Sequence, residues 1–162
     1  MNMGAGLSKN RIKGLSASVD QNSAVLILGT LPGRMSLTYG KYYADPSNKF
    51  WDILFIACGE KIDKTDQGKK QLLEKYHIAL WDILYSAVRK TSNDKDISDE
   101  TPNNLPLFLS QYPNIKLATV YKGNIIKNLI MDCQSYTKYR PNETTGGIFV
   151  SWRRKEELPT GA

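Results

Sequence analysis

The sequence predicts an α/β protein whose central sheet is covered by helices on both faces. Short apolar runs rich in branched residues alternate with longer segments that carry apolar side chains at helical spacing. The runs suit strands buried on both faces, and the segments between them suit the helical crossovers of a parallel sheet. We therefore expect a mainly parallel sheet of four strands in one α/β domain.

Four stretches of the chain are candidates for these strands. The first, residues 24–28, reads Ala-Val-Leu-Ile-Leu and is followed at once by Gly29, where a loop begins. The other candidates are residues 78–81, 116–121 and 148–152. Each is short and apolar, as expected for the interior of a sheet.

Helix candidates fill much of the chain between the strands. Residues 49–57 carry apolar side chains around most of a helix surface, and Gly59 follows as a C-terminal stop. Residues 65–76 are polar with one apolar side, which is typical of an amphipathic surface helix. Further helices are expected over residues 101–109 and 124–131, and an exposed loop over the charge-rich residues 89–100.

Length and composition indicate a single globular domain. The chain has 162 residues, of which 41% are hydrophobic and 23% are charged. We expect a flexible arm over residues 1–14 and one domain over residues 15–162. No apolar run approaches the roughly 18 residues of a membrane span, and the N-terminus lacks the apolar core of a signal peptide. We therefore expect a cytoplasmic monomer, associated with the nucleoid if the source is prokaryotic.

Few residues could support metal or thiol chemistry. Cys58 and Cys133 are far apart and in no paired spacing, which favours buried apolar thiols over a disulfide or a zinc site. The single histidine, His77, lies between a polar helical stretch and a strand, which disfavours a Ser-His-Asp triad. We expect no metal and no other cofactor.

The longest predicted loop leaves the first strand at Gly29 and runs to Asn48. A loop of about twenty residues is unusual in a compact domain unless it forms a binding or lid segment. It contains glycines and prolines that shape the backbone and three tyrosines that offer flat faces. Because ligands lie outside the carboxyl ends of parallel strands, we expect this loop to build the active site.

The start of this loop, residues 29–33, reads Gly-Thr-Leu-Pro-Gly and offers backbone amides to a base edge or a phosphate. It matches neither the GxGxxG fingerprint nor a Walker loop, so nucleoside triphosphate chemistry lacks its usual motif. The net charge of +6 favours a polyanionic partner, and Arg34 and Lys41 flank the loop. Solvated surface charge accounts for the same basic residues equally well.

A longer phrase in this region is more specific. Residues 29–33, followed by Tyr-Tyr-Ala-Asp-Pro-Ser-Asn-Lys-Phe-Trp at 42–51, resemble the first motif of the uracil-DNA glycosylase superfamily. The resemblance is closest to the hypoxanthine-DNA (deoxyinosine) glycosylase branch. It extends over roughly residues 25–131 and includes Ala-Leu-Trp-Asp-Ile-Leu at 79–84 and Asp-Glu-Thr-Pro-Asn at 99–103.

This resemblance implies a three-layer α/β/α sandwich and a monofunctional DNA glycosylase. Such an enzyme flips a deaminated base out of double-stranded or single-stranded DNA and hydrolyses its N-glycosidic bond. Hypoxanthine is the expected base, and uracil is a second candidate. The alternative is a protein with the same fold that binds DNA but has weak or no catalytic activity.

The resemblance also implies roles for individual residues. Tyr43 is expected to stack on the flipped base, with a core tyrosine as the alternative. Asn48 is expected to be catalytic, orienting water toward C1′ or holding the flipped nucleotide. Its alternative role is to cap the helix that follows. Leu31 stands where mismatch-specific relatives have an asparagine. Its apolar side chain cannot orient water by hydrogen bonding, so that role is expected for Asn48, for backbone amides or for a group elsewhere.

The base pocket is expected to comprise Gly29, Thr30, Leu31, Pro32, Gly33, Tyr43 and Asp82. Amides of Thr30 and Leu31 would stabilise the charge that develops on the leaving base. Asp82 would read the base edge, with helix capping as the alternative. Arg34, Lys41 and Lys122 are expected to contact the DNA backbone.

The C-terminal tail departs from the superfamily pattern. Members usually carry a second motif of the LPxxS type that inserts into the minor groove, whereas residues 158–162 read Leu-Pro-Thr-Gly-Ala. The sequence leaves open whether this end is truncated or divergent.

Overall fold

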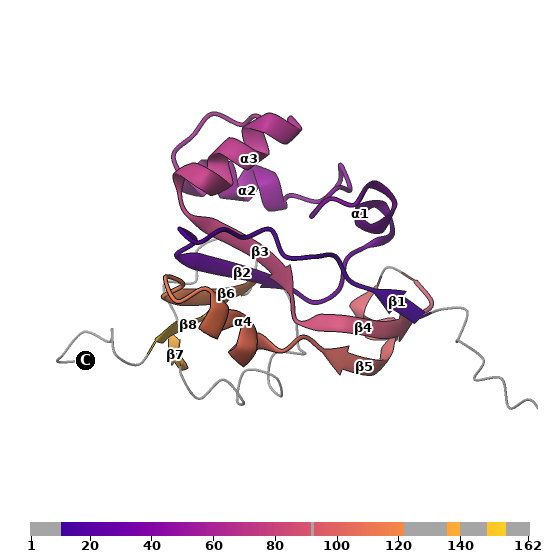
Figure 1. Ribbon diagram of the computed structural model, residues 1–162. Helices are drawn as coiled ribbons and strands as arrows, with labels where there is room; N and C mark the ends of the chain where they lie inside the picture. The colour runs from indigo at the N-terminus through magenta and orange to yellow at the C-terminus, as the bar shows by residue number, and fades with distance from the viewer. Residues whose placement is uncertain (1–10, 92, 122–135, 140–148, 155–162) are drawn as a thin grey trace, which may run out of the picture.

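The computed structural model describes residues 11–91, 93–121, 136–139 and 149–154. Its centre is a five-stranded sheet in the order β3-β2-β6-β8-β7 (Figure 1). The strands are β2 (Val25–Gly29), β3 (Ile78–Asp82), β6 (Leu117–Tyr121), β7 (Tyr136–Tyr139) and β8 (Phe149–Arg154). β2 lies between β3 and β6 and is parallel to both, whereas β8 is antiparallel to β6 and to β7.

The α/β class is therefore confirmed, but the expected four-stranded, mainly parallel sheet is wrong in its details. Three neighbouring strands are parallel, and β8 and β7 extend the sheet beyond β6 through two antiparallel pairings. An apolar run predicts a strand but not its direction, so residues 148–152 gave no sign that β8 is antiparallel. The strand at 136–139 was missed because its sequence, Tyr-Thr-Lys-Tyr, contains no apolar run.

Helices cover both faces of the sheet. Along β2, Leu26 and Leu28 belong to a core cluster shared with helix α4 (Leu105–Gln111). Ile27 points to the opposite face, as alternation along a strand requires, and joins the cluster formed with helices α2 (Phe50–Ala57) and α3 (Asp66–Lys75). Figure 1 shows α2 and α3 above the sheet and α4 below it.

The helix predictions hold for residues 49–57 and 65–76, with small shifts at the ends. Thr65 caps α3 by accepting a hydrogen bond from the Gly68 amide, and Asn104 caps α4 by accepting from the Leu107 amide. The helix expected from residue 101 starts only at Leu105, because residues 101–102 belong to a strand. The expected long loop contains a short helix, α1 (Arg34–Tyr39).

A second, three-stranded antiparallel sheet has the order β1-β4-β5. Its strands are β1 (Arg11–Lys13), β4 (Leu84–Arg89) and β5 (Ile97–Pro102), and a 3₁₀ turn η1 (Asp94–Asp96) precedes β5. The loop expected over residues 89–100 is therefore wrong at both ends, because Arg89 ends β4 and residues 97–100 belong to β5. β5 is a largely exposed edge strand, and its polar sequence gives no apolar run that would predict a strand. The arm expected over residues 1–14 contains β1, whose residues pair with β4.

Only Ile83 separates the last residue of β3 from the first residue of β4, so the chain passes directly from one sheet into the other. This passage lies beside the carboxyl end of β2, where the predicted active-site loop begins. In the part of the chain that the structure describes, no helix has the length and apolar character needed to span a membrane. The helix expected over residues 124–131 lies outside the described residues.

Candidate active site

A cavity of about 1030 Å³ opens at the carboxyl ends of β2 and β3. Its walls come from the loop after β2, the end of β3 and the start of α2. The cavity contains every residue predicted for the base pocket and the predicted catalytic residue: Gly29, Thr30, Leu31, Pro32, Gly33, Tyr43, Asp82 and Asn48. Residues that are distant in sequence thus line one space, which we call the site cavity.

The backbone of residues 29–33 is held from behind by the chain that enters the second sheet. The Gly29 carbonyl accepts a hydrogen bond from the Ile83 amide at 2.8 Å, and the Thr30 carbonyl accepts from the Leu84 amide at 3.1 Å. Both donors belong to the short passage from β3 into β4. The start of the loop is therefore anchored to the scaffold through its carbonyl groups.

The next two carbonyls of the loop are held by Arg89, the last residue of β4. Its Nη1 donates to the Leu31 carbonyl at 3.4 Å, and its Nη2 donates to the Pro32 carbonyl. Arg89 is buried, with 4% of its surface exposed. The sequence prediction missed this residue because it placed Arg89 at the start of an exposed loop.

The anchored carbonyls determine where the loop amides point. In a trans peptide the C=O and N–H groups point in opposite directions, and no described peptide bond is cis. The Thr30 and Pro32 carbonyls point into the scaffold, so the amides of Leu31 and Gly33 point away from it. Because Leu31 and Gly33 line the site cavity, their amides are candidate donors to a ligand there.

The absence of a side chain at Gly29 allows two polar groups to approach the end of β2. A Cβ atom built on Gly29 would lie 2.5 Å from the Asp82 Oδ1 and 3.2 Å from the Tyr43 hydroxyl. Asp82 is only 4% exposed, and its carbonyl accepts a hydrogen bond from the Asn103 side chain at 2.8 Å. Asp82 therefore lines the cavity beside Gly29, and its backbone is held by Asn103. It caps no helix, because β3 leads into β4.

Tyr43 is half-buried in an aromatic cluster at the wall of the cavity. Its ring stacks on Phe50 with centroids 3.6 Å apart, and it meets Tyr121 edge to face at 5.6 Å. The backbone of Tyr43 is left-handed, with φ of 52°, a conformation that is uncommon for a non-glycine residue. Tyr43 therefore packs against the core and also lines the site cavity, and its stacking on a flipped base stays a prediction.

Asn48 lies at the start of α2, with its side chain half-buried at the cavity. Its Oδ1 accepts a hydrogen bond from the Phe50 amide at 2.9 Å, in a turn just before α2. The N-cap of α2 is Lys49, so Asn48 bonds the first residue of the helix without being its cap. A carbonyl oxygen has two lone pairs, and the carboxamide also carries an NH₂ group. The contact with Phe50 therefore fixes the side chain and leaves it able to bind a ligand in the cavity.

Asp45 is a further carboxylate on the cavity wall, and the sequence prediction did not assign it a role. Its Oδ1 accepts hydrogen bonds from the side chain of Ser47 at 2.7 Å and from the Ser47 amide at 2.8 Å. These two bonds, the side-chain one first, lower the pKa of Asp45 below its usual value. A bond from Asp45 to the residue two positions on forms a turn, and the Asp-Pro-Ser sequence at residues 45–47 is typical of such a turn.

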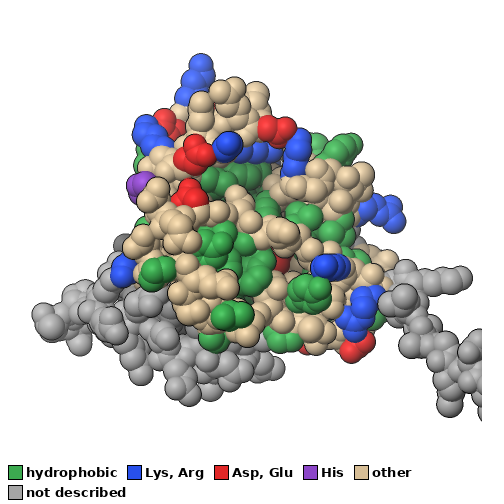
Figure 2. All heavy atoms as spheres, viewed as in Figure 1, with side chains coloured by type: hydrophobic (Ala, Val, Ile, Leu, Met, Phe, Trp, Pro, Cys, Tyr) green, Lys and Arg blue, Asp and Glu red, His purple; other side chains and the backbone are tan. Residues whose placement is uncertain are grey.

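The three basic residues predicted for the DNA backbone lie in different places. Arg34 lines the site cavity and is exposed. Lys41 instead forms an ion pair with Asp66 of α3 at 2.6 Å, and Lys122 lies outside the described residues. Figure 2 shows Lys and Arg side chains interspersed with Asp and Glu over α2 and α3, at the top of the view. On this face, the basic side chains form no separate patch.

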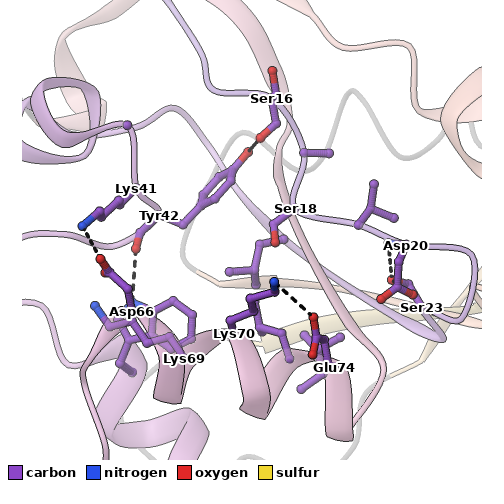
Figure 3. Close-up of a pocket in the computed structure, with 17 residues that line it drawn as sticks. Ser16, Ser18, Asp20, Ser23, Lys41, Tyr42, Asp66, Lys69, Lys70 and Glu74 are labelled. Atoms are coloured by element: carbon purple, nitrogen blue, oxygen red, sulfur yellow. Dashed lines mark hydrogen bonds and ion pairs between the residues drawn. The ribbon is translucent and has the colours of Figure 1, made fainter.

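A second cavity, of about 570 Å³, lies between α3 and the chain segment that leads into β2. Figure 3 shows its charged residues, with Lys41 directed toward Asp66 and Lys70 toward Glu74. We call this space the lateral cavity.

Tyr42 lines both cavities and separates them. Its hydroxyl donates to the Ser16 carbonyl at 2.8 Å, and its carbonyl accepts from the Trp51 indole at 3.1 Å. Burial raises the pKa of Tyr42 far above its usual value, and the Asp82 carboxylate raises it further. The phenol therefore stays protonated and keeps its hydrogen bond over the whole working range of pH.

The described residues contain no group of three or more His, Cys, Asp or Glu side chains that could hold a metal ion. The polar residues that line the site cavity include two asparagines, two aspartates and three tyrosines, besides the backbone of residues 29–33. This set can bind a planar heterocycle through its edge and can orient water beside it.

Comparisons with known proteins agree with this geometry. A protein named hypoxanthine DNA glycosylase from Methanosarcina acetivorans is 34% identical over 148 residues, which are 90% of this chain and 94% of that protein. One of the same name from Methanosarcina barkeri is 34% identical over 106 residues, which are 65% and 67% of the two chains.

A solution NMR structure from Methanosarcina acetivorans, described as a candidate uracil DNA glycosylase, has a TM-score of 0.60 and 33% identity. The match covers 67% of this chain and 68% of that one. The family model of the uracil DNA glycosylase superfamily matches residues 17–154, which include β2, β3, β6 and the site cavity. The chain therefore belongs to the uracil DNA glycosylase superfamily.

Proposed function

We propose that this protein is a monofunctional DNA glycosylase that hydrolyses the N-glycosidic bond of a deaminated base, with hypoxanthine preferred and uracil as a second substrate. The observation that carries the proposal is the site cavity, in which loop amides, Asp82, Tyr43 and Asn48 line one space. The names of the two Methanosarcina relatives support hypoxanthine as the base.

The target base must leave the DNA stack to reach this cavity. The cavity of about 1030 Å³ has room for a base together with its sugar and a water molecule. Tyr43, backed by Phe50, provides an aromatic wall on which the flipped base stacks. Stacking of this kind contributes about 1 to 3 kcal/mol per base.

Asp82 and the loop amides together fit the edge that deamination creates. Hypoxanthine and uracil each present a ring N–H next to a carbonyl oxygen, whereas adenine and cytosine present an acceptor nitrogen next to an amino group. The Asp82 carboxylate accepts from the ring N–H, and the amides of Leu31 and Gly33 donate to the acceptors of the base. Adenine or cytosine would leave the Asp82 carboxylate, which is 4% exposed, without this bond.

In the reaction, water attacks C1′ and the bond from C1′ to the base nitrogen breaks. The base leaves with the electron pair and takes up a proton, and the proton lost by the water returns to solvent. The Oδ1 of Asn48, fixed by the Phe50 amide, accepts a hydrogen bond from the attacking water. The loop amides stabilise the negative charge on the departing base. No lysine forms a covalent bond to the sugar in this scheme.

The test uses four matched duplexes that contain deoxyinosine, deoxyuridine, deoxyadenosine or deoxycytidine at one position. We expect strand breaks after alkali treatment for deoxyinosine, fewer for deoxyuridine, and none for the two normal nucleosides. Borohydride should trap no covalent complex. If none of the duplexes is cleaved while salt-dependent binding persists, the protein is a DNA-binding relative without catalysis, and the proposal is wrong.

A further inference from the structure

We propose that Arg89 is a positioning residue for base excision, acting through the backbone of residues 31–33. The inference rests on the proposed glycosylase activity and adds a residue from the second sheet to it. Arg89 ends β4, and its guanidinium lies behind the loop that forms the base pocket.

The contacts of Arg89 are directed at two consecutive carbonyl groups. Nη1 donates to the Leu31 carbonyl and Nη2 to the Pro32 carbonyl, so the planar fork of the guanidinium holds both. The two groups are 58 and 57 residues away in sequence. A lysine at this position could not hold both carbonyls with the same geometry, because its ammonium group is a single centre.

Of these two carbonyls, only that of Pro32 belongs to a peptide that also carries an N–H. The Leu31 carbonyl is bonded to the proline nitrogen, which has no hydrogen. The Pro32 carbonyl is bonded to the nitrogen of Gly33, whose N–H points away from Arg89. A Cβ atom built on Gly33 would meet nothing within 4 Å, so the space in front of this residue is open.

Hydrogen bonding at a carbonyl polarises its peptide and makes the N–H on the other side a stronger donor. A charged donor on the Pro32 carbonyl therefore strengthens the Gly33 amide as a donor to the departing base. Arginine stays protonated at every working pH, so this effect is constant. Arg89 touches neither base nor water in this arrangement, and it acts through the peptide that it holds.

Three variants separate the charge of Arg89 from its fork geometry. Arg89→Lys keeps the charge and loses the fork, Arg89→Gln keeps a donor and loses the charge, and Arg89→Met loses both. Arg11→Gln is the matched control, since Arg11 lies in the same sheet and bonds Ser86 and Asp99 instead of the loop. The substrates are DNA duplexes with uracil or 5-fluorouracil, because the second base is the more acidic leaving group.

Single-turnover rates give the first readout. Arg89→Met should slow the release of uracil by about 10²-fold, the scale on which one transition-state donor acts. The loss of rate for 5-fluorouracil should be several-fold smaller, since a better leaving group needs less stabilisation. The rates of the Lys and Gln variants should lie between those of the wild-type protein and Arg89→Met. Equal losses for both bases would show a purely structural residue, and unchanged rates would exclude any role. Where Arg89→Met does not fold, the same comparison of the rate losses for uracil and 5-fluorouracil is made with the Lys and Gln variants.

Amide chemical shifts give a second readout that needs no turnover. Arg89→Lys should move the ¹H and ¹⁵N shifts of Gly33, whereas Arg11→Gln should leave them in place. An unmoved Gly33 signal would overturn the positioning role even in an active enzyme. If the wild-type protein releases neither base, the glycosylase proposal fails, while this measurement still tests the link between Arg89 and the loop.

Discussion

The two cavities of this protein lie on either side of Tyr42, yet they are built in different ways. Polar groups of the site cavity are held from both sheets, and its Asp82 carboxylate is buried. Charged groups of the lateral cavity belong mostly to α3 and pair with each other near solvent. Lys41 and Asp66, for example, have side chains 50% and 70% exposed. Buried polar groups thus distinguish the site cavity from the lateral cavity, whose ion pairs are exposed.

The comparison also concerns energy. Exposed ion pairs such as those of the lateral cavity contribute about 0 to 1 kcal/mol each. A buried polar group that loses its partner costs about 1 to 3 kcal/mol, so the groups of the site cavity are more sensitive to change. The effects of substitutions at the two cavities should therefore differ in magnitude and in the property affected, which is excision rate, stability or DNA binding.

The largest effect is expected at Asn48. Asn48→Ala should lower the excision rate by about 10²-fold or more, because it removes the group that we propose orients the water. Lys70→Ala in the lateral cavity is the control and should leave the rate unchanged. Asn48→Ser keeps a side-chain oxygen that can accept from the Phe50 amide, without the carboxamide. Single-turnover assays should find the serine variant as slow as the alanine variant. Full activity in the serine variant would limit the role of Asn48 to its bond with the Phe50 amide.

The next largest effect is expected at the end of β2. Gly29→Ala would bring a Cβ atom to within 2.5 Å of the Asp82 carboxylate, which must then move. We expect a loss of about 1 to 3 kcal/mol in the free energy of unfolding, the usual cost of overpacking. Gly33→Ala is the matched control, since its Cβ meets nothing within 4 Å and its φ is −71°. Urea denaturation of both variants would check this, and equal stability would contradict the close approach of Asp82.

A smaller effect is expected at the wall between the cavities. Tyr42→Phe removes the hydrogen bond to the Ser16 carbonyl and should reduce stability by about 1 kcal/mol. The excision rate should change by less than about threefold, because the ring and the backbone bond to Trp51 remain. Thermal unfolding and the excision assay measure the two quantities. A large loss of rate at unchanged stability would place the hydroxyl in the reaction.

The smallest effect is expected for the two basic residues beside the loop. Arg34→Ala should weaken DNA binding and reduce the slope of log K against log salt by about 1, as for one phosphate contact. Lys41→Ala should leave the slope nearly unchanged, since Lys41 pairs with Asp66. Binding titrations at several salt concentrations would test this difference. Equal slopes for the two variants would remove Arg34 from the DNA-binding surface.

The contiguous part of the site could be predicted from the sequence. Residues 29–33 and 42–51 form one phrase after an apolar strand, and parallel topology brings Asp82 to the same edge. The contribution of the second sheet could not be predicted, because β5 is polar and Arg89 resembles surface charge. Lys41 is close to the loop in sequence, but an ion pair turns it toward α3.

Arg89 also has a consequence for how the protein folds. Its bonds to Leu31 and Pro32 span 58 and 57 residues, so the loop is secured only after β4 has joined the structure. Contacts of such high sequence separation require a large loss of chain entropy and form late. Residues 31–33 should then become protected from hydrogen exchange no earlier than β4 does during refolding. A chain in which β4 is unpaired would lack the fixed loop, so we expect activity to return only after β4 has joined the second sheet.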